Sequence, residues 1–153
     1  MDAEELRRVM SHWATGVAVV TSRGDEGPRG ATTNALTSLS LDPPLVLVCL
    51  DNGSNTLAAA RASRRFCINV LAVGQEEIAR RFATKESGEE KLAGLPHDLA
   101  DGVPVLHGVL AWLVCEVEQE VAGGDHEILI GRPLETGGDE EAQPLVFFGA
   151  RYL

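Results

Sequence analysis

The sequence has no long apolar run and few basic residues, and both absences limit what the protein can do. No apolar stretch approaches the roughly 20 residues that a bilayer crossing requires. The first residues lack the basic and then apolar layout of a signal peptide, so we expect a cytoplasmic protein that does not enter a membrane. Lys and Arg number 13 against 23 Asp and Glu, which gives a formal net charge of −10. This balance argues against the clustered basic surface that binds nucleic acid.

Several common catalytic and cofactor-binding motifs are also missing. The chain carries no Gly-x-Gly-x-x-Gly fingerprint, no Walker loop, no His-Glu-x-x-His pair and no Gly-x-Ser-x-Gly elbow. Cys49, Cys67 and Cys115 lie inside apolar or alternating runs without Cys-x-x-Cys spacing, so we interpret them as small buried hydrophobic residues. The four histidines show no metal-ligand spacing, and we expect no metal site. Abundant hydroxyls with few acid/base pairs suit a protein that holds a reactive cofactor and leaves the chemistry to it.

The pattern of apolar residues predicts one domain over 1–153, mainly β with peripheral helices. Apolar spacing and helix-start signals predict three helices, over 2–12, from the turn at 51 to about 61, and over 75–84. β-Branched and alternating runs bounded by turn residues predict strands over 16–22, 29–37, 45–50, 65–71, 109–121, 126–132 and 145–148. Residues 85–102 have the composition of a polar loop. The long hairpin near the C-terminus, joined to the earlier strands, favours a closed antiparallel sheet.

Residues 29–50 hold an unusual concentration of Thr, Ser and Asn, followed by Pro43-Pro44 and an apolar strand. Hydroxyl and amide groups between apolar strands are costly to bury unless each finds a hydrogen-bond partner. A flat cofactor with polar acceptors would supply such partners. Solvent on an ordinary loop would do so too, and this stretch by itself leaves both alternatives open.

A second candidate site is the start of the predicted helix after residue 51, where Ser54 or Asn55 can serve as the N-cap. The first turn of a helix presents free N–H groups and the positive end of the helix dipole, which together bind anions. The alternative is a plain N-cap without a ligand.

Five blocks of the sequence, in order and spread over nearly the whole chain, resemble the flavin reductase-like family. They are TGVAVVT at 15–21, the stretch from GATTNALTSLS to the apolar strand at 30–50, FCINVL at 66–71, GDHEILIG at 124–131 and FFGARY at 147–152. The resemblance implies an FMN-binding split β-barrel, usually a homodimer, which passes a hydride from NADH or NADPH to FMN or FAD. Many members are the small reductase component of two-component flavin monooxygenases, so the resemblance also implies a monooxygenase partner.

The resemblance assigns residues to two ligands. Those at the flavin are Thr32, Thr33, Asn34, Ala35, Thr37, Ser38, Leu39, Ser40, Ser54, Asn55, Thr56, Phe82, Ala83 and Lys85. Within this set the segment 54–56 meets the flavin phosphate, and Lys85 offers it a positive charge, although a solvated lysine is the alternative. His126 and Tyr152 match positions beside the nicotinamide. No side chain is implied as an obligatory acid or base.

Three functions remain to be separated. The favoured one is an NAD(P)H-dependent flavin reductase, and the second is a flavin-binding barrel that does not turn over free flavin. The third is a structural or partner-binding barrel that holds no flavin. The sequence does not decide between FMN and FAD or between NADH and NADPH.

Overall fold

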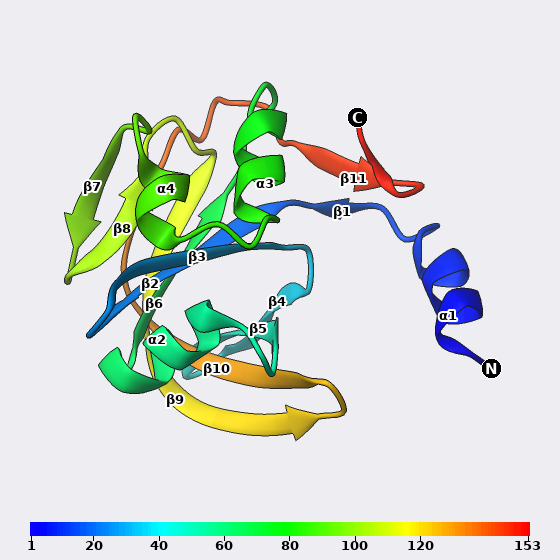
Figure 1. Ribbon diagram of the computed structural model, residues 1–153, viewed down its shortest axis with the longest axis horizontal. Coiled ribbons are helices and arrows are strands. Elements are labelled where there is room, and N and C mark those ends of the chain that lie inside the picture. The colour runs from blue at the N-terminus through cyan, green and yellow to red at the C-terminus, as the bar shows by residue number, and fades with distance from the viewer.

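The protein, described here over residues 1–153 by a computed structural model, is built mostly of antiparallel strands with four short helices around them (Figure 1). The helices are α1 (Ala3–Met10), α2 (Asn55–Ser63), α3 (Glu76–Phe82) and α4 (Gly88–Leu92). The main sheet contains β2 (Ala18–Gly24), β3 (Gly27–Thr33), β4 (Leu36–Leu41), β5 (Pro44–Asp51), β6 (Arg65–Val70), β9 (Ala111–Gly123) and β10 (His126–Gly137). The smaller sheets contain β7 (His97–Ala100) with β8 (Val103–Leu106), and β1 (Thr15–Gly16) with β11 (Val146–Phe148) and β12 (Arg151–Tyr152). The prediction of a mainly β fold with peripheral helices is confirmed.

The main sheet is a barrel that does not close completely. Its strand order is β3-β2-β6-β9-β10-β5-β4, so β3 and β4 are the two edges. Only Asn34 and Ala35 separate these edges in the chain, and three residue steps span at most about 11 Å. The sheet must therefore curl until its edges meet at this point. Because no ladder joins β3 to β4, the barrel stays split along that line.

The first five residues of strand β2 are all buried, so both of its faces are covered there and its apolar residues do not alternate with exposed ones. Ala18 and Val20 join the core inside the barrel, to which α2 adds Leu57. Val17 and Val19 face the other way and pack in a second core under α3 and the C-terminal segment. The barrel wall therefore has an inner and an outer apolar layer, and both hold β2 in place.

Two sequence predictions need correction. The strand predicted over 29–37 ends at Thr33 and restarts at Leu36, because the chain crosses between sheet edges there and the Thr33 hydroxyl accepts a hydrogen bond from the Ala35 N–H at 3.0 Å. The loop predicted over 85–102 contains α4 and β7. Ser87 begins α4 as its N-cap and accepts from the Glu90 N–H at 3.1 Å, a signal that the polar composition obscured.

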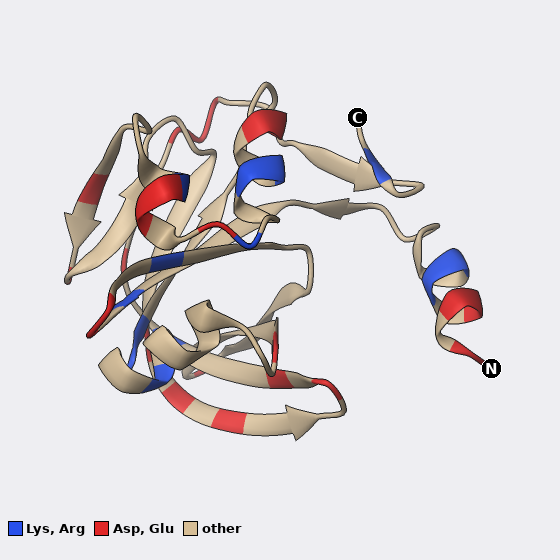
Figure 2. Cartoon of the chain, viewed as in Figure 1, with Lys and Arg blue, Asp and Glu red and all other residues tan.

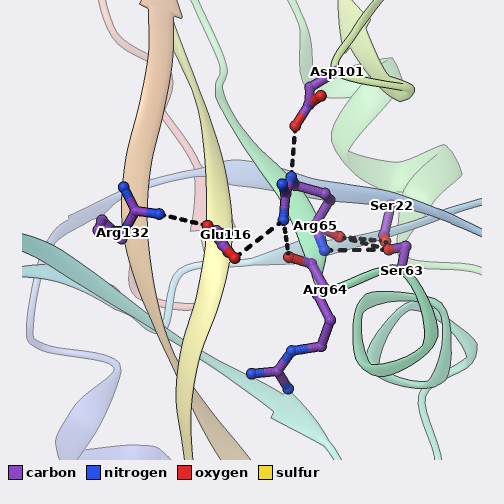
Figure 3. A network of polar contacts seen from close by, with 7 residues as sticks. All are labelled: Ser22, Ser63, Arg64, Arg65, Asp101, Glu116 and Arg132. Atoms are coloured by element: carbon purple, nitrogen blue, oxygen red, sulfur yellow. Dashed lines mark hydrogen bonds and ion pairs between the residues drawn. The ribbon is translucent and has the colours of Figure 1, made fainter.

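Ion pairs connect neighbouring strands on the outer surface of the barrel. Arg65 on β6 bonds Asp101 at 2.5 Å and lies 3.6 Å from Glu116 on β9, which in turn bonds Arg132 on β10 (Figure 3). Asp101 lies in the turn between β7 and β8, so this network attaches that hairpin to the barrel. Elsewhere the two signs of charge are interspersed, with basic positions on α2 near acidic positions on β9 and β10 (Figure 2). None of the helices combines the length and apolarity that a membrane crossing demands.

Candidate functional site

The candidate site is a cavity of about 510 Å³ where strand β3, the loop after β5, the start of α2 and the α3–α4 segment meet. These segments come from widely separated parts of the chain, and the split in the barrel places them next to one another. A volume of roughly 300–1,000 Å³ is typical of small-molecule sites. Polar residues and glycines dominate the lining, which suits a ligand with charged or hydrogen-bonding groups.

The N-terminus of α2 forms one wall of this cavity. Ser54 is the N-cap, and its hydroxyl oxygen accepts from the N–H groups of Thr56 at 3.2 Å and Leu57 at 3.3 Å. The Asp51 carboxylate accepts from the Gly53 N–H at 2.8 Å and fixes the turn that precedes the helix. The positive end of the helix dipole therefore lies at the cavity, and the Ser54 hydroxyl keeps its own proton to donate.

A buried lysine and an arginine contribute positive charge to the same cavity. Lys91 on α4 is 7% exposed, and its Nζ donates to the carbonyl oxygens of Gly30 at 2.9 Å and Phe82 at 3.5 Å. Burial lowers the pKa of the Lys91 ammonium; Glu86 opposes this effect and Arg29 adds to it. Two neighbouring cations beside a helix N-terminus form an electrostatic environment that an anion would stabilise.

Two glycines allow α3 and α4 to approach β3 closely enough to form the cavity. A Cβ on Gly30 would lie 2.5 Å from the ring of Phe82, and one on Gly88 would overlap the carbonyl oxygen of Pro28. Side chains at these positions would force the α3–α4 segment away from β3. The shape of the cavity thus depends on both glycines.

Half of the residues that the resemblance assigns to the flavin line this cavity. They are Thr32, Ser54, Asn55, Thr56, Phe82, Ala83 and Lys85. The Thr32 hydroxyl donates to the carbonyl oxygen of Ala79 at 2.6 Å, which leaves its oxygen able to accept from a ligand. Thr32 also lines a small adjoining cavity of about 120 Å³, together with Thr33, Asn34 and Tyr152. Thr32 therefore connects the two spaces.

The remaining assigned residues lie at the end of β3, in the break between β3 and β4, and on β4. Asn34, Ala35 and Thr37 border a cavity of about 560 Å³ beside α1. Ser38, Leu39 and Ser40 lie on the edge strand β4, outside the three cavities described so far. Within one chain, then, the hydroxyl-rich stretch is divided between several surfaces, and the flavin role of 37–40 stays a prediction.

The two residues assigned to the nicotinamide lie apart in the fold. His126 begins β10, where its Nδ1 donates to the Asp125 carboxylate at 2.7 Å and thereby holds the pKa of Asp125 below its usual value. It pairs across the sheet with Asp51, at the loop that lines the main cavity. Tyr152 is in β12, where its ring packs 5.4 Å from that of Phe147. A shared nicotinamide role for His126 and Tyr152 stays a prediction.

Sequence reasoning missed Lys91 and Arg29, which both line the main cavity. A signal for Lys91 was present, because Ser87 and Glu90 have the spacing of a helix start and place Lys91 within α4. Its burial against the Gly30 carbonyl, 61 residues away in the chain, has no local signal.

Comparison with known proteins identifies the family. Residues 10–153 match the model of the flavin reductase like domain. The chain belongs to the flavin reductase-like family. It is 38% identical, over 99% of its length and 80% of the relative, to the reductase component of the 4-nitrophenol 4-monooxygenase/4-nitrocatechol 2-monooxygenase of Rhodococcus opacus.

Solved structures of this family have the same fold. The NADH:FAD oxidoreductase of Streptomyces globisporus C-1027 superposes with a TM-score of 0.93 at 36% identity, covering 99% of this chain and 92% of that one. The styrene monooxygenase flavin reductase of Pseudomonas putida S12 superposes with a TM-score of 0.87 at 34% identity, covering 97% and 96%. In this flavin reductase-like chain, the helix N-terminus, the Thr32 hydroxyl, Arg29 and Lys91 offer hydrogen-bond donors and positive charge that suit an anionic ligand.

Proposed function

We propose that the protein is an NAD(P)H-dependent flavin reductase that uses FMN or FAD and NADH or NADPH. The observation that carries the proposal is the cavity of about 510 Å³, which combines the N-terminus of α2 with Arg29 and Lys91 in a chain of the flavin reductase-like family. In this proposal 1–153 is a single flavin reductase-like domain that works in the cytoplasm.

The residues of the chain bind and orient the reactants. The Ser54 hydroxyl donates to the phosphate at the positive end of the α2 dipole, while Thr32 and the Gly30–Phe82 contact shape the wall beyond it. A bound flavin supplies the capacity to accept a hydride from the nicotinamide. The protein holds the two rings in register and keeps water away, and no side chain needs to move a proton.

The recipient of the reduced flavin is, in this proposal, a flavin-dependent monooxygenase. The support is that the Rhodococcus relative is named as the reductase component of a monooxygenase, and the Pseudomonas structure as a styrene monooxygenase flavin reductase. The net charge of −10 on this chain would attract a partner whose docking surface is basic.

A homodimer is the proposed oligomeric state, and α1 is its main support. This helix projects away from the barrel in Figure 1 and has no buried residue. Its apolar residues Leu6, Val9 and Met10 are exposed, and Trp13 just beyond it is 70% exposed. Met10 and Trp13 border the cavity of about 560 Å³ that Leu36 and Leu47 also line. A second copy that covers this apolar surface would stabilise both helices.

The oligomeric state can be tested with Trp13→Ser and Val9→Glu. We expect the unmodified protein to sediment as a dimer at micromolar concentration and both variants to shift toward the monomer. Arg8→Gln, on the same helix but polar, is the matched control and should leave the dimer intact. An unmodified monomer that still binds flavin would contradict the dimer without affecting the reductase proposal.

Two measurements test the function itself. Gel filtration after addition of flavin should leave the flavin absorbance with the protein, and a colourless protein would favour the structural or partner-binding barrel. Turnover of NADH or NADPH with excess flavin should then follow. Flavin that is retained without turnover would favour the second candidate, a flavin-binding barrel that is not a free-flavin reductase.

A further inference from the structure

A second cavity shares two of its lining residues with the candidate flavin site. It has a volume of about 290 Å³ and lies between the β2–β3 turn and the outer face of α2. Arg29 and Asn55 line both this cavity and the main one of about 510 Å³. The two spaces therefore form one groove that passes the N-terminus of α2, with the Arg29 side chain at the junction.

The Arg29 guanidinium is poised to bind an anion at this junction. Its side chain is 20% exposed, and it makes two hydrogen bonds, to the carbonyl oxygen of Pro28 at 3.0 Å and to the Glu26 carboxylate at 3.4 Å. Glu26 is itself 90% exposed, so this pair is weak and easily exchanged. A guanidinium has five N–H donors and a permanent positive charge, which leaves donors for a phosphate.

The lining of the second cavity differs from that of the first. Ala58, Ala59 and Ala62 contribute small apolar side chains from α2, while Asp25 and Glu26 contribute carboxylates from the β2–β3 turn. Those carboxylates would repel a phosphate but accept hydrogen bonds from sugar hydroxyls or an exocyclic amine. A flat base carrying a ribose fits this combination. A volume of 290 Å³ suits a nucleoside, because whole drug-sized ligands occupy sites of roughly 300–1,000 Å³.

We propose that this groove makes FAD the preferred flavin over FMN. The first phosphate lies at the N-terminus of α2, the second at Arg29, and the adenosine occupies the cavity between the β2–β3 turn and α2. Arg29 is then the residue that determines flavin specificity. This inference rests on the proposed function, because it extends the same flavin site.

The first test compares flavin affinities of Arg29→Gln by fluorescence titration. FMN ends at the first phosphate, whereas FAD continues past Arg29. Loss of a hydrogen bond to a charged group should therefore weaken FAD binding roughly tenfold to hundredfold. FMN binding should weaken less, because FMN loses only the positive charge that Arg29 adds to the main cavity. Arg23→Gln is the matched control, because Arg23 is exposed on the same hairpin and lines neither cavity. It should leave both affinities unchanged.

The second test fills the adenosine cavity. Ala58 is an exposed position of α2, so Ala58→Phe should fold. The larger side chain should fill the second cavity and reduce the preference for FAD, while FMN binding is retained. Equal affinities for FMN and FAD in the unmodified protein, or an unchanged preference in both variants, would overturn the inference and leave the reductase proposal standing. Failure to bind either flavin would instead overturn the proposed function.

Discussion

Substituting Ser54 by Asp separates the two roles that this residue can have. As an N-cap, Ser54 accepts hydrogen bonds from the Thr56 and Leu57 N–H groups. Asp caps helices as well as Ser does, and its charge is favourable at a helix N-terminus, so Ser54→Asp should keep or slightly raise the free energy of unfolding. A carboxylate at the same point would repel a phosphate held there.

The expected loss of flavin affinity is large. Two like charges about 4 Å apart repel by about 4 kcal/mol at an effective dielectric constant of about 20, which corresponds to roughly a thousandfold change in the dissociation constant. Ser54→Ala should behave differently. It removes the cap, at a cost of about 1 kcal/mol in stability, and one hydrogen bond to a charged group, which weakens binding roughly tenfold to hundredfold.

Flavin fluorescence titration and denaturant unfolding of each variant measure the two effects separately. Ser63→Ala is the matched control, because Ser63 lies at the other end of α2 and donates to the Ala59 carbonyl oxygen at 2.9 Å. It should lower stability without changing flavin affinity. If Ser54→Asp bound flavin as tightly as the unmodified protein, Ser54 would be a plain cap and the phosphate would bind elsewhere.

Further predictions concern the thiols, the nicotinamide and the surface ion pairs. Burial raises the pKa of Cys67 and of Cys115 to about 12, so neither thiol should react with an alkylating reagent at neutral pH until the protein is unfolded; rapid labelling of the folded protein would refute this. Because the folded-state pKa values of these thiols are raised, their contribution to the free energy of unfolding is complete below the ordinary thiol pKa and is lost as the pH rises toward 12. The free energy of unfolding of Cys67→Ala, measured with urea, should therefore fall less steeply at alkaline pH than that of the unmodified protein. His126→Ala should raise the KM for NADH or NADPH more than it lowers kcat, with flavin affinity nearly unchanged, because positioning contacts are shared by ground and transition states; a collapse of the limiting reduction rate at normal nicotinamide affinity would make His126 a chemical participant instead. Arg65→Met should lower the free energy of unfolding by about 1 kcal/mol, and high salt should reduce this difference because the ion pairs with Asp101 and Glu116 are partly exposed. A double-mutant cycle with Asp101→Asn measures the coupling energy between Arg65 and Asp101. A coupling energy of zero would show that this ion pair does not attach the β7–β8 hairpin to the barrel.

Local signals explain why part of the site was predictable from sequence. Ser54 and Asn55 follow a turn and precede an apolar helix, and this pattern depends on neighbouring residues alone. The structure places both at the start of α2, where they line the main cavity. Lys91 is the opposite case, because its burial depends on carbonyl oxygens of Gly30 and Phe82 that only the folded chain brings to it.

The split in the barrel is a second feature that local sequence signals do not predict. The composition of 29–37 predicts one continuous strand, and nothing in that stretch reveals that β3 and β4 are opposite edges of a curled sheet. Sheet closure is decided by pairings between distant strands, such as β5 with β10 and β6 with β9. The spacing of apolar residues within a single segment does not specify which distant strand it pairs with.

Anaerobic rapid mixing of the flavin-loaded protein with NADH or NADPH tests directly whether the protein is a flavin reductase. We predict that the flavin absorbance bleaches in a single turnover, with one nicotinamide oxidised for each flavin reduced, and that added free flavin is then reduced catalytically. A flavin that stays bound and oxidised in the presence of both nicotinamides would contradict it.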